Sequence, residues 1–79
     1  MRIYDPDSQR TLKNVMLFLT PEEAADLGFS ATDLSKHSEK HHHHVNDAEC
    51  SKEITVAVYT DDNLKSFDEE SRRVIQEKD

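Results

Sequence analysis

The apolar side chains of this chain are concentrated in two short runs. In the second run, β-branched apolar residues occupy every other position. Ile54, Val56 and Val58 fall on one side of an extended backbone, and the residues between them fall on the other. Period-two alternation of β-branched residues is typical of a half-buried strand. Because a single strand is not stable alone, the run 54–60 requires a partner strand and a covering layer.

The first run, residues 15–19, consists of five consecutive apolar side chains. It follows Leu12 and is closed by Thr20 and Pro21. A helix this short would be marginal, whereas a continuous apolar run bounded by turn residues suits a strand. We therefore predict a strand from Leu12 to Leu19.

Two hairpins are predicted around these strands. The N-terminal segment 3–4 precedes a turn over residues 5–8, where a proline presets one turn dihedral and the Asp and Ser side chains bond locally. The second hairpin pairs residues 41–45 with residues 54–60, because strands that follow one another in sequence are usually neighbours in space.

A helix start is marked by Thr20, which can cap free amides, and by Glu23 three residues later. Pro21 at the first helical position loses no hydrogen bond, so we predict a helix that begins there. Its inward face is predicted to consist of Ala24, Leu27, Gly28, Ala31 and Leu34. The alternative is two short helices, the first ending at Gly28 and the second opening at Ser30.

A last helix is predicted from Phe67 to about Glu77. Ser66 with Glu69 three residues later has the pattern of a capping box. Phe67 and Val74 lie seven residues apart and therefore share a face. Acidic residues precede basic ones along this segment, which is the order that the helix dipole favours.

The predicted element order is strand, strand, helix, strand, strand, helix. It describes a small α+β two-layer sandwich of about four mostly antiparallel strands with both helices on one face, formed as one domain by residues 1–79. The other face would expose Met16, Phe18 and Tyr59, which is more apolar surface than a monomer usually shows. This open face is therefore a candidate for self-association or for a protein partner; the alternative is that the N-terminal segment folds over it.

Four consecutive histidines, residues 41–44, are the most unusual feature of the chain. On a strand, His42 and His44 share one face, roughly 6.6 Å apart along the backbone, and His41 and His43 point to the other. Two imidazoles at this spacing can hold one Zn²⁺ or Ni²⁺ ion. His42 and His44 are therefore the first candidate metal ligands.

A fifth histidine, His37, lies four residues before His41. If the first helix continued through the run, these two would form an i, i+4 pair that can also hold a metal. A tight zinc site requires three or four ligands, and no second histidine-rich or cysteine-pair segment completes one. Asp47, Glu49 and Cys50 of the following loop could complete such a site, but the loop length does not enforce it. The alternatives are an exposed strand that binds nickel or zinc only weakly and incidentally, and a proton-sensing role. Because neighbouring imidazoles repel one another when charged, we expect the pKa of the cluster at or below the ordinary histidine value.

Catalysis is not predicted, and no cofactor is expected apart from that metal. Cys50 lies in a polar loop, with no helix N-terminus to lower the pKa of its thiol. A chain with one glycine has no phosphate-cradling loop. Acidic clusters fall at a strand end and at a helix start, where acids serve structural roles. The sequence therefore predicts a non-enzymatic protein.

Charge and hydropathy limit the partners. The 10 basic and 17 acidic residues give a net charge of −7, which argues against nucleic acid. Such a charge would steer a basic protein partner, or it serves solubility alone. No apolar run reaches the ~18 residues of a membrane span, and the N-terminus lacks an apolar signal, so no membrane partner is expected. With a lone cysteine, these features predict a cytoplasmic protein.

Overall fold

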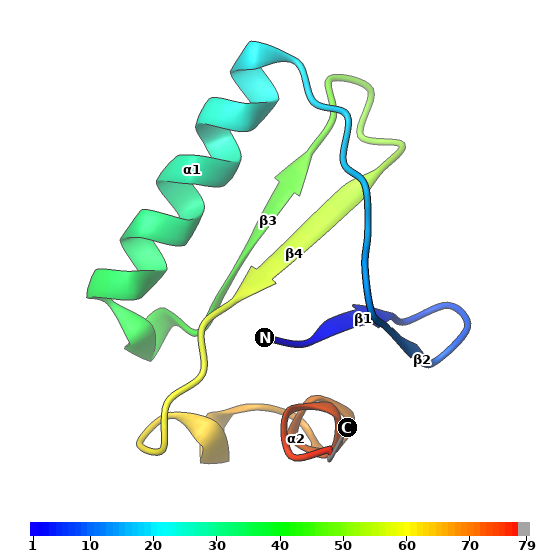
Figure 1. Ribbon diagram of the computed structural model, residues 1–79. Helices are drawn as coiled ribbons and strands as arrows, with labels where there is room; N and C mark the ends of the chain where they lie inside the picture. The colour runs from blue at the N-terminus through cyan, green and yellow to red at the C-terminus, as the bar shows by residue number, and fades with distance from the viewer. Residues whose placement is uncertain (78–79) are drawn as a thin grey trace.

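The computed structural model describes residues 1–77 and confirms the α+β class and the element order ββαββα. The strands are β1 (Ile3–Asp5), β2 (Arg10–Leu12), β3 (His42–Asn46) and β4 (Glu53–Ala57), and the helices are α1 (Pro21–Lys36) and α2 (Glu69–Ile75). The predicted hairpin of residues 41–45 and 54–60 is confirmed as β3–β4. An N-terminal hairpin forms as well, but its second strand is Arg10–Leu12 and not Leu12–Leu19. The two hairpins remain separate antiparallel sheets and do not join into one four-stranded sheet (Figure 1). None of the helices within these residues is long and apolar enough to cross a membrane.

Helix α1 begins as predicted and continues without interruption for 16 residues. The hydroxyl of Thr20 accepts a hydrogen bond from the backbone amide of Glu23 at 3.2 Å. The Glu23 carboxylate accepts one from the Thr20 amide at 2.9 Å, which completes the capping box. The two-helix alternative is therefore wrong. Gly28 lies inside the helix, and a Cβ added there would meet nothing within 4 Å.

The buried face of α1 differs in part from the predicted one. Leu34 is fully buried, Ser30 is buried and Leu27 is half-buried, in steps of three and four that keep them on one stripe. The predicted inward positions that prove exposed are Ala24, Gly28 and Ala31. Relative to the prediction, α1 is rotated about its axis. Asp33, next to Leu34, faces β3 and contacts His43 there.

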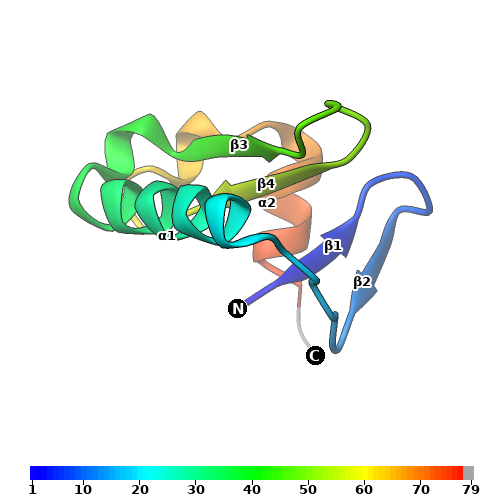
Figure 2. The same cartoon turned by 90° about the horizontal axis from the view of Figure 1, so that it is seen from above.

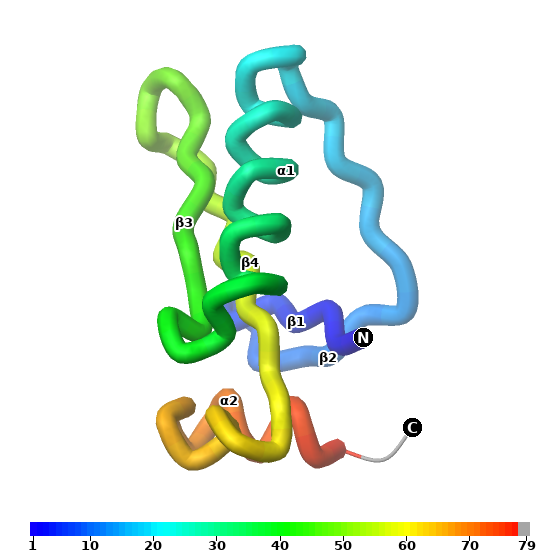
Figure 3. Tube along the Cα trace, turned by 90° about the vertical axis from the view of Figure 1, so that its left-hand side faces the viewer, coloured from blue at the N-terminus to red at the C-terminus, as the bar shows by residue number. Residues whose placement is uncertain are grey.

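The β3–β4 hairpin presents one face to α1. His43 pairs with Val56, and Val45 pairs with Ile54, so these four side chains share a face. Val45 is buried, and α1 lies across this face, as Figure 3 shows. The opposite face carries Thr55 and Ala57, which line a cavity together with residues of β1 and α2. The two helices therefore lie on opposite sides of the hairpin rather than on one face.

The predicted strand from Leu12 to Leu19 is wrong over most of its length. β2 ends at Leu12, and within residues 1–77 no strand pairs with residues 13–20. This segment runs extended from β2 to the start of α1 (Figure 1). It does not extend a sheet with β4, and the β1–β2 hairpin that precedes it forms a separate sheet (Figure 2).

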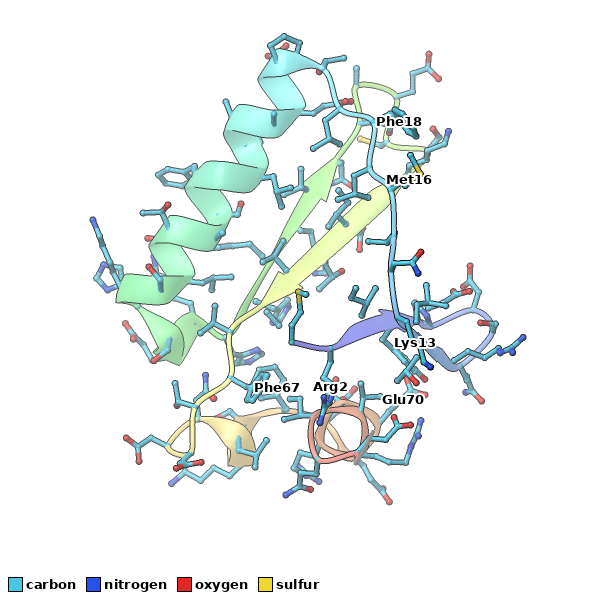
Figure 4. The ribbon with its side chains drawn as sticks, in the orientation of Figure 1. Arg2, Lys13, Met16, Phe18, Phe67 and Glu70 are labelled. Carbon is cyan, nitrogen blue, oxygen red and sulfur yellow. The ribbon has the colours of Figure 1, made fainter. Side chains whose placement is uncertain are left out.

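Helix α2 is shorter than predicted, and its N-cap lies two residues later. Asp68 is its N-cap and accepts a hydrogen bond from the Ser71 amide at 2.8 Å. The predicted cap, Ser66, ends a short 3₁₀ turn instead. Arg2 of the N-terminal segment points to α2 (Figure 4), donating from Nε to the Val74 carbonyl at 3.2 Å and from its terminal nitrogen to the Glu77 carbonyl. These bonds tie the N-terminal segment to the last turn of α2 and to the residues that follow it.

Candidate functional site

The exposed part of the extended segment, residues 15–18, is the first candidate; we call it the apolar segment. The exposed fractions of its side chains are 52% at Val15, 76% at Met16, 49% at Leu17 and 85% at Phe18. This alternation indicates a strand-like backbone with the odd-numbered side chains turned toward the molecule. Met16 and Phe18 therefore share one side of the segment and are more exposed than the residues on either side of Met16 (Figure 4).

A groove of about 510 Å³ lies between the apolar segment and the β3–β4 hairpin. Residues 16–19 line it from one side, Met16 and Phe18 included, and Val45 and Ile54 line it from the other. The third residue of the predicted surface, Tyr59, lies just beyond β4 and lines a different cavity, with Tyr4 and Val74. The structure thus brings Met16 and Phe18 together and places Tyr59 elsewhere.

His43 lies on the face of β3 that meets α1. Its Nε2 is 2.8 Å from Oδ2 of Asp33, and Nζ of Lys40 is 3.1 Å from the same oxygen. These hydrogen bonds, with that of His43 the stronger cause, hold the pKa of the Asp33 carboxyl below its usual value. His43 therefore links β3 to α1 and is not directed to solvent with its neighbours.

We expect stability to fall on acidification through Asp33. A carboxyl whose pKa is lower in the folded chain binds fewer protons there than in the unfolded chain, so its contribution is complete above the unfolded value of 3.8 and is lost as pH falls through the folded value. The thermal midpoint of Asp33→Asn, followed by circular dichroism, should be lower than that of wild type at pH 7. Its decline between about pH 5 and pH 3 should be smaller.

The matched control for this measurement is Asp26→Asn, which changes an exposed carboxyl on the same helix. Its pH profile should follow that of wild type. Equal profiles for wild type and Asp33→Asn would contradict the role assigned to the Asp33 ion pairs.

His44 and His37 each lie beside a carboxylate of a nearby residue. On the outer face of the hairpin, Nδ1 of His44 lies 2.9 Å from the Glu53 carboxylate and 3.0 Å from the Thr55 hydroxyl. His37 ends α1, and its Nδ1 lies 3.6 Å from the Glu39 carboxylate. The helix stops there, so the i, i+4 pair of His37 and His41 does not form.

His41 is the one histidine of the run that lies outside β3. Its backbone is left-handed, with φ of 45°, and this turn places its ring beside that of His42. The two Nδ1 atoms are 2.7 Å apart, and the ring centroids are 4.5 Å apart. The His44 ring stands edge-on to His42 at 5.1 Å. The closest pair of ring nitrogens is thus His41 with His42 and not the predicted His42 with His44.

Burial lowers the pKa of His42, and the charges of His41 and His44 lower it further. The expectation that crowding depresses the titration of the cluster is confirmed for His42, although desolvation is the larger cause. Within residues 1–77 no group of three or more His, Cys, Asp or Glu side chains is arranged to hold a metal ion. Cys50 is an exposed free thiol in the β3–β4 loop.

Two features therefore stand out on the described surface: the apolar segment and the His41–His42 pair. The periodicity of the sequence could not identify the second, because it depends on one left-handed residue at the start of β3. Comparison of the chain with protein-family models, with curated proteins and with solved structures finds no match.

Proposed function

We propose that the chain is a non-enzymatic interaction protein that associates with a second copy of itself through the apolar segment. The observation that carries this proposal is the extended backbone of residues 13–20, which no strand within residues 1–77 pairs, together with the high exposure of Met16 and Phe18. Unpaired extended segments readily add a strand from another chain, since both backbones then satisfy their amides and carbonyls.

A second copy fits this segment better than an arbitrary partner does. In an antiparallel pair centred on Leu17, Met16 of each copy lies directly opposite Phe18 of the other, and the outer side chains form one apolar patch. The same register places Lys13 beside the start of α1 in the other copy, next to Glu22. Opposite charges then meet at both ends of the paired segment.

The absence of catalytic function is part of the proposal. The groove beside the apolar segment has no histidine, cysteine or serine among its described lining residues, so it lacks a nucleophile with its base. A net charge of −7 repels phosphate, and the proposal therefore includes no nucleic-acid partner. A single cysteine, exposed and unpaired, suits a reducing compartment, and we place the protein in the cytoplasm.

Replacing Phe18 with serine should abolish self-association. An interface of this size is at the small end for protein contacts, so we expect wild type to be a dimer at about 100 μM and to dissociate on dilution. Phe18→Ser should remain a monomer at the same concentration, as measured by sedimentation equilibrium. Because Phe18 is 85% exposed, the thermal midpoint of the monomer should change little.

Phe29 provides a matched control, because it is also a highly exposed phenylalanine, 72%, but lies on α1. Phe29→Ser should dimerise as wild type does. A wild-type chain that stays monomeric at the highest soluble concentration would refute the proposal, as would equal losses for both serine variants. Crosslinking of wild type to a different protein, with no homodimer, would assign the segment to another partner and would also overturn it.

A further inference from the structure

We propose that His41 and His42 form a two-imidazole chelate for a divalent transition metal of tetragonal or octahedral geometry, Cu²⁺ or Ni²⁺. The two Nδ1 atoms are 2.7 Å apart and belong to adjacent residues. In the metal-free chain one of these nitrogens donates a hydrogen bond to the other. When a metal binds, that proton moves to Nε2 of its own ring, and both Nδ1 lone pairs become available.

The number of ring nitrogens available favours a metal that keeps water among its ligands. The 2.7 Å separation is that of a hydrogen bond in the metal-free chain, and the nitrogens move apart to the about 2.9–3.4 Å that two ligands of one ion require. Within residues 1–77 no third His, Cys, Asp or Glu side chain completes the three or four protein ligands of a tight zinc site. Cu²⁺ and Ni²⁺ prefer 90° angles and bind nitrogen ligands more tightly than most other ions, whereas Zn²⁺ prefers the tetrahedron. Water fills the remaining positions of such an ion.

The pair is held in place by the structure around it. The His41 amide donates to the Ser38 carbonyl, and its carbonyl accepts from the Val58 amide, both at 3.1 Å. Nδ2 of Asn63 donates to the Ser38 and Val58 carbonyls at 2.8 and 2.9 Å, fixing both segments that hold His41. The His41 ring lies 4.9 Å from the ring of buried Phe67. A ligand fixed in this way loses little conformational entropy when it binds the metal.

The backbone of His41 supports a role for this side chain. Residues other than glycine adopt a left-handed conformation uncommonly, and histidine is among those that do so more often. Gln9 and Cys50 also have positive φ, so at His41 the significance lies in what the turn brings together. This turn brings the His41 ring onto the ring of His42, which a regular strand would not do.

The remaining histidines of the run make matched controls. His43 is bound to Asp33 on the opposite face, and His44 is bound to Glu53 and Thr55. A structured chelate should therefore depend on His41 and His42 alone. An unstructured histidine tract would lose affinity equally for each imidazole removed.

The test is calorimetric titration of the chelator-treated full chain with CuCl₂, NiCl₂ and ZnCl₂. We expect one Cu²⁺ or Ni²⁺ per chain, and weaker binding of Zn²⁺. His41→Gly, which suits the left-handed backbone, and His42→Gln should each weaken Ni²⁺ binding about 10- to 100-fold, because each leaves a single ligand. His43→Gln and His44→Gln should change it less than about threefold.

Equal losses in all four variants would overturn the proposal, as would Zn²⁺ binding more tightly than Ni²⁺. Because His43→Gln also removes an ion pair, a second measurement uses the wild-type chain alone. Substoichiometric Cu²⁺ should first broaden the NMR signals of His41, His42 and the Phe67 ring, and only later those of Asp33. Uniform broadening of the whole run would equally refute the chelate. Sedimentation of Phe18→Ser with and without Ni²⁺ keeps this test separate from self-association.

Discussion

Replacing Leu34 with alanine is expected to lower the free energy of unfolding by about 2–5 kcal/mol. Leu34 is 0% exposed and is the one large side chain that is fully buried among residues 1–77. The other buried apolar side chains among residues 1–77 are few: Val45, Phe67 and Val74. A domain of this size has little stability to spare, so we expect much of the variant to be unfolded at 37 °C. Urea denaturation followed by circular dichroism gives the difference.

Leu27→Ala removes the same side-chain atoms two turns earlier, on the same face of α1. Leu27 is only half-buried, so its replacement should cost clearly less than that of Leu34. Equal costs for the two variants would mean that the contact between α1 and the β3–β4 hairpin is not centred on Leu34.

Replacing Asn63 with alanine is expected to lower the free energy of unfolding by about 2–5 kcal/mol, as much as a core leucine. Oδ1 of this 8% exposed residue accepts from the Thr60 amide at 2.7 Å, and Nδ2 donates to the Ser38 and Val58 carbonyls. Alanine leaves all three backbone groups without this partner in a part-buried site. Urea denaturation measures the loss, and amide hydrogen exchange at Thr60 should accelerate.

Two further variants sharpen this result. Asn63→Asp keeps the acceptor for Thr60 but loses both bonds donated by Nδ2, so its stability should fall between those of wild type and Asn63→Ala. Asn14→Ala changes an exposed asparagine in the extended segment and should cost less than about 0.5 kcal/mol. If Asn63→Ala were as stable as Asn14→Ala, the hydrogen bonds of the Asn63 side chain would not stabilise the fold as argued.

Local signals in the sequence predicted local structure well. The capping box of Thr20 and Glu23 sets the start of α1, because all its partners lie within one turn. The alternation at residues 54–58 identified the face of β4 that meets α1, since period-two exposure depends only on the strand itself. The hairpin at residues 3–12 followed in the same way from its turn residues.

What the sequence did not reveal depends on contacts between distant segments. Residues 15–19 have strand-like side chains, but whether they pair depends on where the first hairpin docks, and it docks on α2. Asn63 bonds to Ser38, 25 residues away, and no local pattern marks such a residue. The His41–His42 pair forms because the backbone of one residue, His41, is left-handed and not extended as the strand pattern predicts.

The attachment of Arg2 to the end of α2 has a consequence for the order of folding. The Arg2 bonds join residues 72 and 75 positions apart, whereas β3 and β4 are joined by a short loop and α1 directly precedes them. Closing the longer loop costs more chain entropy, and long-range contacts form slowly. We therefore expect the α1–β3–β4 unit to assemble first and the contact of Arg2 with the end of α2 to form last. By the same reasoning we expect that contact to open first in the native state, so that the two sides of the β3–β4 hairpin differ in kinetic stability.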